Sequence, residues 1–273
     1  MRLNNKWKKV LLGISAALLL LVLNTSSANN DEIDTKKIYD HCENKPQGKD
    51  QKTKLIIIFN SDAERQDKSA YIRYWKDYGG KKNVVDKTVI DTKYPPEQRD
   101  IRFLRVGYTD KSGKPPDQWV YLPEMKFVKR ISQRSAHDLS WGYTDDDLRI
   151  RGYKEDKHTL DGSQTDKGVT VYRMTSIPKK SPLYSKRITW YKKEQEWDSC
   201  HPVKIDYYDK KGNLMKRHTM TWQVIKGAWL WETVSVENLS TAEFITYKVT
   251  DAEVDVGLED KIFTERMLRR GYK

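Results

Sequence analysis

The side chains able to carry out chemistry are few in this chain, and none is arranged as catalysis requires. His137 and Asp138 suggest acid–base chemistry, but neighbours on a strand or loop point apart and no activated nucleophile accompanies them. Asp145-Asp146-Asp147 suggests calcium, but the glycine and final glutamate of a calcium loop are missing, so the acids fit the first turn of a helix better. His158 and His218 stand as isolated polar residues. We therefore predict no enzyme and no catalytic residue.

The two cysteines, Cys42 and Cys200, are the next candidates for chemistry. In an exported protein a single pair favours a disulfide, which we predict between them. His41 and His201 flank the cysteines, so a bridge would bring both imidazoles close together and a Cys2His2 metal site is conceivable. The close paired spacing usual in zinc sites is missing, however. We expect the disulfide, with no metal and no other cofactor.

The amino-terminal end predicts export. Arg2, Lys6 and the pair Lys8-Lys9 precede the apolar run Val10–Leu23, and small residues follow at Ser26-Ser27-Ala28. This is the order of a signal peptide, and the apolar run is shorter than the roughly 20 residues that span a bilayer. We expect residues 1–28 to be a cleaved signal and 29–273 to be one periplasmic domain. An uncleaved anchor is the rival interpretation.

The charge restricts the partners without naming one. The formal charge is +12, and removal of the four basic residues of the signal leaves +8. The basic residues are spread among 39 acidic ones, as on a solvated surface, although attraction to anionic headgroups or to an acidic partner stays open. Nucleic acid is excluded as an expected partner, because the chain is exported and carries no nucleic-acid-binding motif.

The periodicity predicts a mainly β protein, since runs of 5–12 apolar-alternating residues follow one another with turn signals between them. Such a succession forms an antiparallel sheet that must curl or close, with helices at one side or end. Helices are expected at Asp31–Glu43, Asp145–Arg151 and Asp260–Arg270. The expected strands are Leu55–Asn60, Ala70–Lys76, Val84–Ile90, Ile101–Val106, Gln118–Leu122, Lys126–Ser132, Val169–Thr175, Lys186–Lys192, Val203–Tyr208, Leu214–Ile225, Trp229–Glu237 and Ala242–Thr250.

Alternation along these strands separates an inner from an outer set of side chains. The large apolar members of the expected inner set are Trp119, Tyr121, Ile131, Trp190, Tyr207, Met220 and Trp222. An aromatic stripe with period two is ordinary sheet core, but the same stripe can line an apolar cavity. Alternation alone does not distinguish a filled barrel from a hollow one.

Several segments resemble the outer-membrane lipoprotein-sorting protein family, which is related to the periplasmic lipoprotein carrier LolA. The resemblance runs from about Ile101 to the carboxyl terminus, with its motifs in the same order and spacing. The matching segments are Trp119-Val-Tyr-Leu-Pro123 with Lys129-Arg130-Ile131, Gly142–Leu148, Ile177-Pro-Lys179 with Tyr184 and Trp190, Tyr208–Lys216, Thr241–Phe244 and Phe263–Leu268.

The resemblance implies an incomplete antiparallel β-barrel of 11–12 strands, closed on one side by short helices that act as a lid. It also implies a carrier that shields acyl chains of lipids or lipoproteins in an apolar cavity, and on that basis the seven side chains above are the candidate cavity wall. A membrane exporter or an outer-membrane acceptor is then the expected protein partner. The alternative is an interaction module that docks to an envelope exporter or assembly complex and carries nothing.

Overall fold

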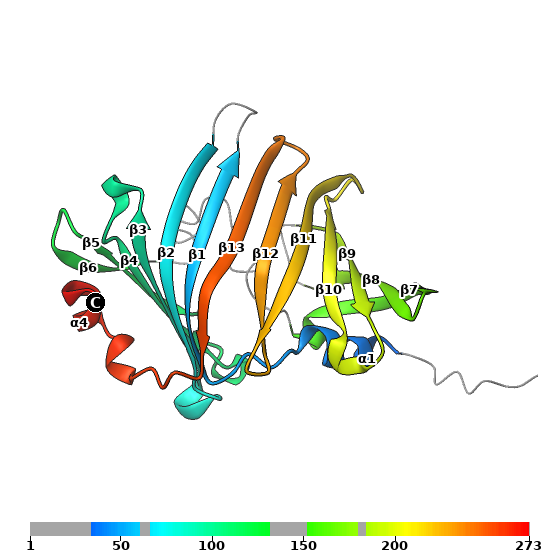
Figure 1. Ribbon diagram of the computed structural model, residues 1–273, viewed down its shortest axis with the longest axis horizontal. Coiled ribbons are helices and arrows are strands. Elements are labelled where there is room, and N and C mark those ends of the chain that lie inside the picture. The colour runs from blue at the N-terminus through cyan, green and yellow to red at the C-terminus, as the bar shows by residue number, and fades with distance from the viewer. Residues whose placement is uncertain (1–33, 61–65, 132–151, 180–183, 273) are drawn as a thin grey trace, which may run out of the picture. The chain divides into compact units, whose positions relative to one another are not determined.

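The computed structural model describes residues 34–60, 66–131, 152–179 and 184–272, which form one antiparallel sheet (Figure 1). The sheet has thirteen strands in the order β6-β5-β4-β3-β2-β1-β13-β12-β11-β10-β9-β8-β7. Each strand pairs with its neighbours in the sequence, except that β6 and β7 do not pair with each other and that β1 also pairs with β13. β6 and β7 remain as two unpaired edges, so the sheet is not closed. The predicted incomplete antiparallel barrel is confirmed.

The strands are β1 (Asp50–Asn60), β2 (Gln66–Asp77), β3 (Val84–Tyr94), β4 (Arg102–Tyr108), β5 (Asp117–Leu122), β6 (Phe127–Ile131), β7 (Asp156–Asp166), β8 (Val169–Pro178), β9 (Lys186–Lys193), β10 (His201–Tyr208), β11 (Leu214–Ile225), β12 (Ala228–Asn238) and β13 (Glu243–Val254). The main helical segments are α1 (Thr35–Ile38), the π-helical turn η1 (Tyr39–Glu43), the 3-10 turn η7 (Asp260–Ile262) and α4 (Glu265–Arg270).

All twelve predicted strands are present, and the sheet gains one that alternation did not reveal. The additional strand, β7, has the polar sequence DKHTLDGSQTD. It is an edge strand, so only β8 pairs with it and six consecutive residues at its end are exposed. The buried residue of this strand is its first one, Asp156, whose carboxylate forms an ion pair with Arg187. The strand was missed because Leu160 is the one large apolar residue in its sequence.

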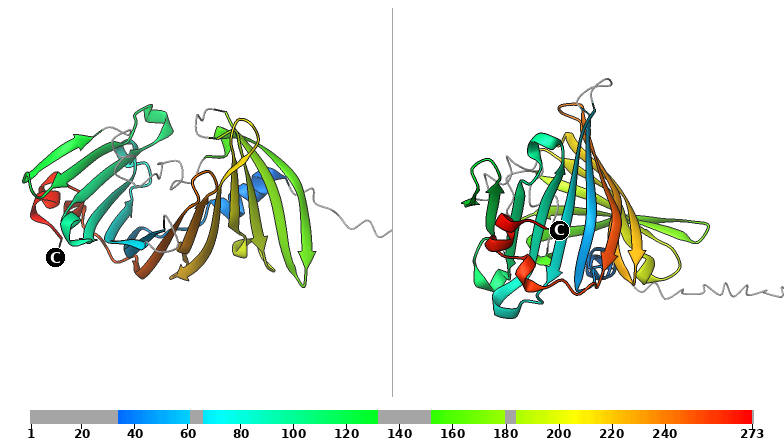
Figure 2. Two further views of the ribbon diagram at one scale, coloured as in Figure 1. Left: turned by 90° about the horizontal axis from the view of Figure 1, so that it is seen from above. Right: turned by 60° about the vertical axis from the view of Figure 1, so that its left-hand side comes forward.

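The register assigns every side chain of the central strands to one of two faces. Ile57 of β1 lies opposite Ser69 on β2 and Tyr247 on β13, whereas Ile58 lies opposite Lys68 and Thr246. The sheet is strongly curved (Figure 2). We call the face that carries Ile57 the inner face and the face that carries Ile58 the outer face. Next to β1 the outer face is polar, with an exposed Lys248 on β13, so the apolar residues concentrate on the inner face.

The carboxyl-terminal segment packs on the outer face of β3 to β6. Leu268 of α4 is fully buried there, in a cluster with Tyr74, Val89 and Leu104. The predicted helix Asp260–Arg270 is divided into η7 and α4, because the hydroxyl of Thr264 caps a new start by accepting from the Met267 amide. α4 thus lies on the face opposite Ile57 and does not cover the inner face. The predicted helix Asp145–Arg151 lies outside the described residues.

The amino-terminal segment crosses the base of the sheet below β7 to β12 (Figure 1). Ile38 is fully buried, and the carbonyl of Pro46 accepts a hydrogen bond from the Trp229 amide at 2.7 Å. Cys42 is bonded to Cys200, which confirms the predicted disulfide. The bridge joins residues 158 positions apart, so it fixes the segment to β10. Among the described residues, no helix is both long and apolar enough to cross a membrane.

Replacing both cysteines, as Cys42→Ala with Cys200→Ala, is expected to lower the free energy of unfolding by about 2–5 kcal/mol, because the bridge closes a long loop in the unfolded chain. Urea unfolding followed by tryptophan fluorescence measures the change. The matched control is the unaltered protein unfolded with and without a reductant, which should show the same loss. An unchanged midpoint in both experiments would contradict a stabilising role for the bridge.

Candidate functional site

An apolar wall covers the inner face of five adjacent strands, β1, β13, β12, β11 and β10. Because side chains opposite one another in an antiparallel pair share a face, Tyr207, Met220, Val234, Tyr247 and Ile57 all belong to it. The buried members of the wall are Tyr184, Ile205, Tyr207, Met220, Val234, Val236, Ile245 and Tyr247. Partly exposed apolar side chains that pack against them include Leu55, Ile57, Phe59, Trp222 and Trp231.

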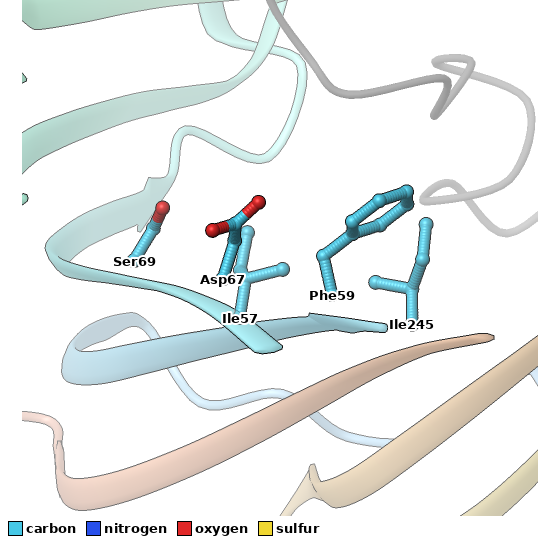
Figure 3. A pocket seen from close by; sticks show the side chains of 5 residues that line it. All are labelled: Ile57, Phe59, Asp67, Ser69 and Ile245. Carbon is cyan, nitrogen blue, oxygen red and sulfur yellow. The ribbon is translucent and has the colours of Figure 1, made fainter. Parts of the chain in front are cut away.

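A small, shallow hollow, partly open to solvent, lies at the end of this wall near the tips of β1 and β2. Three apolar side chains, Ile57, Phe59 and Ile245, form most of it, and Asp67 and Ser69 complete it. Figure 3 shows all five standing on the same side of β1, β2 and β13. The hollow is therefore one place where solvent reaches the wall.

The seven candidate cavity residues do not lie on one face. Tyr207 and Met220 are buried in the wall, and Trp222 packs against it with its indole donating to the Pro202 carbonyl at 2.7 Å. Ile131 is also on the inner face, opposite Gln118, but on the distant edge strand β6. The wall thus brings together three of the seven.

The other three candidates point to the outer face. Trp119 and Tyr121 pack beneath the carboxyl-terminal segment, in the cluster that holds Leu268. Trp190 lies under Lys204, whose ammonium nitrogen is 3.5 Å from the ring centroid. These positions follow from pairing, since Trp119 lies opposite Leu104, which lies opposite Val89. Alternation placed these three aromatic residues on the inner face, whereas the register places them on the outer face. Their strands carry apolar residues on both faces, so alternation alone did not show which face is inner.

The apolar run of β1 contains the hollow residues that alternation did not identify. Leu55 to Phe59 reads LIIIF, so five consecutive apolar residues give no phase. The polar residues directly next to the run, Lys54 and Asn60, share a parity with Ile56 and Ile58, so they indicate that Leu55, Ile57 and Phe59 lie on the other, less polar face. The pairing of Ile57 with Ser69 and Tyr247 agrees with this assignment. The signal for these residues is therefore in the residues that flank the run, together with the register.

Comparison with known proteins gives the family. The profile of a family described as an uncharacterized protein matches residues 85–270. A DUF1329 family protein from Desulfovibrio piger is 24% identical, with a TM-score of 0.71 over 85% of this chain and 98% of that one. The chain belongs to the DUF1329-like family.

Two further solved structures share the fold of this DUF1329-like protein. A putative outer membrane lipoprotein-sorting protein domain from Vibrio parahaemolyticus is 23% identical, with a TM-score of 0.68 over 86% of this chain and 96% of its own. A LolA superfamily protein from Nitrosomonas europaea is 19% identical, with a TM-score of 0.61 over 85% and 98%. The DUF1329-like chain therefore has a lipoprotein-sorting-type fold. No curated protein matches its sequence.

The base of this DUF1329-like protein holds the two histidines that flank the disulfide. His41 lies against Trp197, with ring centroids 5.3 Å apart, and His201 lies against Trp229 at the same separation. Both neighbouring sulfurs are bonded to each other, so neither is a thiolate able to bind a metal. Within the described ranges no group of three His, Cys, Asp or Glu residues is placed to hold a metal ion. His137, Asp138 and Asp145–Asp147 lie outside those ranges.

His158 of the DUF1329-like protein joins β7 to the Tyr153 carbonyl and to Ser176 on β8. Its Nε2 is 2.9 Å from the Tyr153 carbonyl oxygen and its Nδ1 is 2.9 Å from Ser176 Oγ. A carbonyl only accepts, so Nε2–H donates and Nδ1 accepts from the hydroxyl. Burial lowers the pKa of His158, and the nearby Arg187 guanidinium lowers it further, against the effect of the Tyr153 carbonyl. The folded protein therefore disfavours the protonated ring.

Acid should weaken the fold through this group. A histidine whose pKa is lower in the folded than in the unfolded state, where it is about 6.5, makes the unfolded chain bind more protons. Stability should therefore fall as the pH drops from 7.5 to 5.5. Urea midpoints at these two pH values should differ less in His158→Gln than in the unaltered protein. An equal pH dependence in both proteins would show that His158 does not contribute.

Proposed function

We propose that the protein is a periplasmic carrier that binds the acyl chains of a lipid or lipoprotein along the apolar wall. The observation that supports this most directly is the wall itself, which is mostly apolar across five strands, with the buried His218 among its members, and partly accessible at Ile57 and Phe59. Ligand sites of this kind are concave, mostly apolar and supplied with few polar groups. Asp67 and Ser69 are the polar groups at the hollow.

The free energy of transfer explains why such cargo needs a carrier. Moving a methylene group from an apolar environment into water costs about 0.8 kcal/mol of free energy, so exposing a sixteen-carbon chain costs on the order of 12 kcal/mol. Contact with the wall at the hollow replaces water around part of that chain. A carrier therefore needs no catalytic group, and the proposal assigns none.

The setting of this carrier is the periplasm, reached through the signal peptide of residues 1–28. Fold similarity to an outer membrane lipoprotein-sorting domain supports this assignment. The partners would be a membrane protein that delivers the lipid and an acceptor that receives it. A protein that only docks to an envelope complex is the alternative, and it requires that the wall bind no lipid.

The first measurement is native mass spectrometry of the protein purified from the periplasm, followed by organic extraction. A carrier should retain a phospholipid or an acylated peptide in part of the population. An uncharged fluorescent diacylglycerol should also enter the purified protein. A mass without ligand, together with no uptake of the probe, would contradict the carrier and favour the docking protein.

Two adjacent isoleucines give a matched pair of variants. Ile57→Asp places a charge in the hollow, so probe uptake is expected to fall about tenfold or more, since a buried carboxylate is costly beside apolar groups. Ile58→Asp changes the same residue type one position along β1, but on the polar outer face opposite Lys68 and Thr246. It should bind like the unaltered protein. Urea unfolding of both variants reports their stability, and equal uptake by the two would contradict binding at the hollow.

A further inference from the structure

A lone arginine lies on the inner face of β2, along the same strand as the hollow. Arg73 follows Ser69 by four residues, so the two lie roughly 13 Å apart along the strand, with Tyr71 between them. All three share a face because Ser69 pairs with Ile57, Tyr71 with Leu55 and Arg73 with Thr53. One face of β1 and β2 therefore changes from apolar at the hollow to basic at Arg73.

The contacts of Arg73 are polar or aromatic, and none is a carboxylate. One of its terminal nitrogens donates to Gln51 Oε1 at 2.8 Å, and its guanidinium carbon is 5.9 Å from the Trp75 ring centroid. Within the described residues its side chain forms no ion pair within 4 Å. A guanidinium has five N–H donors, so one such hydrogen bond leaves most of them available.

The nearest acid, Asp86, already has other partners. One of its carboxylate oxygens accepts from Arg105 at 2.9 Å and the other from the Trp75 indole at 3.1 Å. Gly107 accommodates this pair, since a Cβ there would lie 2.2 Å from Asp86 Oδ1. Asp86 therefore accepts from Arg105 and Trp75, and it gives the Arg73 guanidinium only a partial electrostatic attraction without an ion pair.

The other positions around Arg73 on this face do not supply an acid. Thr53 and Ile90 lie directly opposite it on β1 and β3, and Tyr71 and Trp75 lie two residues away on β2. Burial lowers the pKa of Arg73 to about 10, and Asp86 only partly opposes this. The guanidinium is still charged near neutral pH, although its surroundings disfavour the charge. An anion from outside the chain would correct this imbalance.

We infer that Arg73 binds the phosphate of the lipid whose acyl chains occupy the hollow. This inference rests on the proposed carrier function and adds a ligand class to it: an acyl lipid with an anionic phosphate. Guanidinium and phosphate form paired charge-assisted hydrogen bonds, which are stronger than neutral ones. The arrangement is complementary to such a lipid, because the apolar hollow and the cationic Arg73 follow each other along β1 and β2, as the acyl chains and the phosphate do in the lipid.

The test uses two lipids with identical acyl chains, phosphatidic acid and diacylglycerol, which differ only in the phosphate. The unaltered protein should take up phosphatidic acid roughly ten- to a hundredfold more tightly, as expected for charge-assisted hydrogen bonds. Arg73→Gln should remove this preference while binding diacylglycerol as before. Arg73→Lys should retain part of it, because it keeps the charge and loses the planar pair of donors. Lys68→Gln, on the outer face of the same strand, is the matched control and should keep the full preference.

The outcomes separate the two proposals. Uptake of both lipids with equal affinity by the unaltered protein would overturn the role of Arg73 and leave the carrier function standing. The same would follow if Arg73→Gln kept the full preference. Uptake of neither lipid would overturn both. Inorganic phosphate is also tested alone. If phosphate binds the lipid-free protein, while the protein takes up the two lipids with equal affinity, Arg73 belongs to a free-anion site and the lipid assignment is overturned.

Discussion

An unclosed sheet of thirteen strands has two faces and two edges, and the rest of this structure depends on how they are covered. The chain uses its two ends on opposite faces. The amino-terminal segment crosses the base and is bonded to β10 through Cys42, and the carboxyl-terminal segment buries Leu268 on the outer face. Between them the inner face of five strands is left to an apolar wall with a hollow at one end. The fold thus leaves one apolar surface that no described helix needs for its own packing.

The edges are protected by the composition of the strands at the ends of the sheet. An unpaired strand invites pairing with another chain, and natural sheets resist this with charges and irregularities. β7 carries Lys157, Asp161 and Asp166, and its register shifts between Leu160 and Gly162. β6 is only five residues long and includes Lys129 and Arg130. The edges of this unclosed sheet therefore disfavour pairing with a strand of another chain.

Much of the fold could be predicted from the sequence, because alternation and turn residues define antiparallel strands locally. Twelve strands, the unclosed antiparallel sheet and the Cys42–Cys200 pair were predicted. β7 was missed since Leu160 is the one large apolar residue in its sequence. The site was predicted only in part, because period two gives two faces and not which one is inside. Trp119 and Trp190, which lie on the outer face, show this.

The wall consists of the same side chains that hold the centre of the sheet together. On the outer face of β13 the residues Thr246 and Lys248 are polar. The apolar contacts that stabilise these strands are therefore made on the inner face, by Ile245, Tyr247 and their neighbours. A molecule bound to this wall is in contact with the protein's core. Such binding would raise the free energy of unfolding by an amount that grows with the logarithm of the ligand concentration relative to the dissociation constant. The protein with a ligand on this wall would therefore melt at a higher temperature than the protein without one.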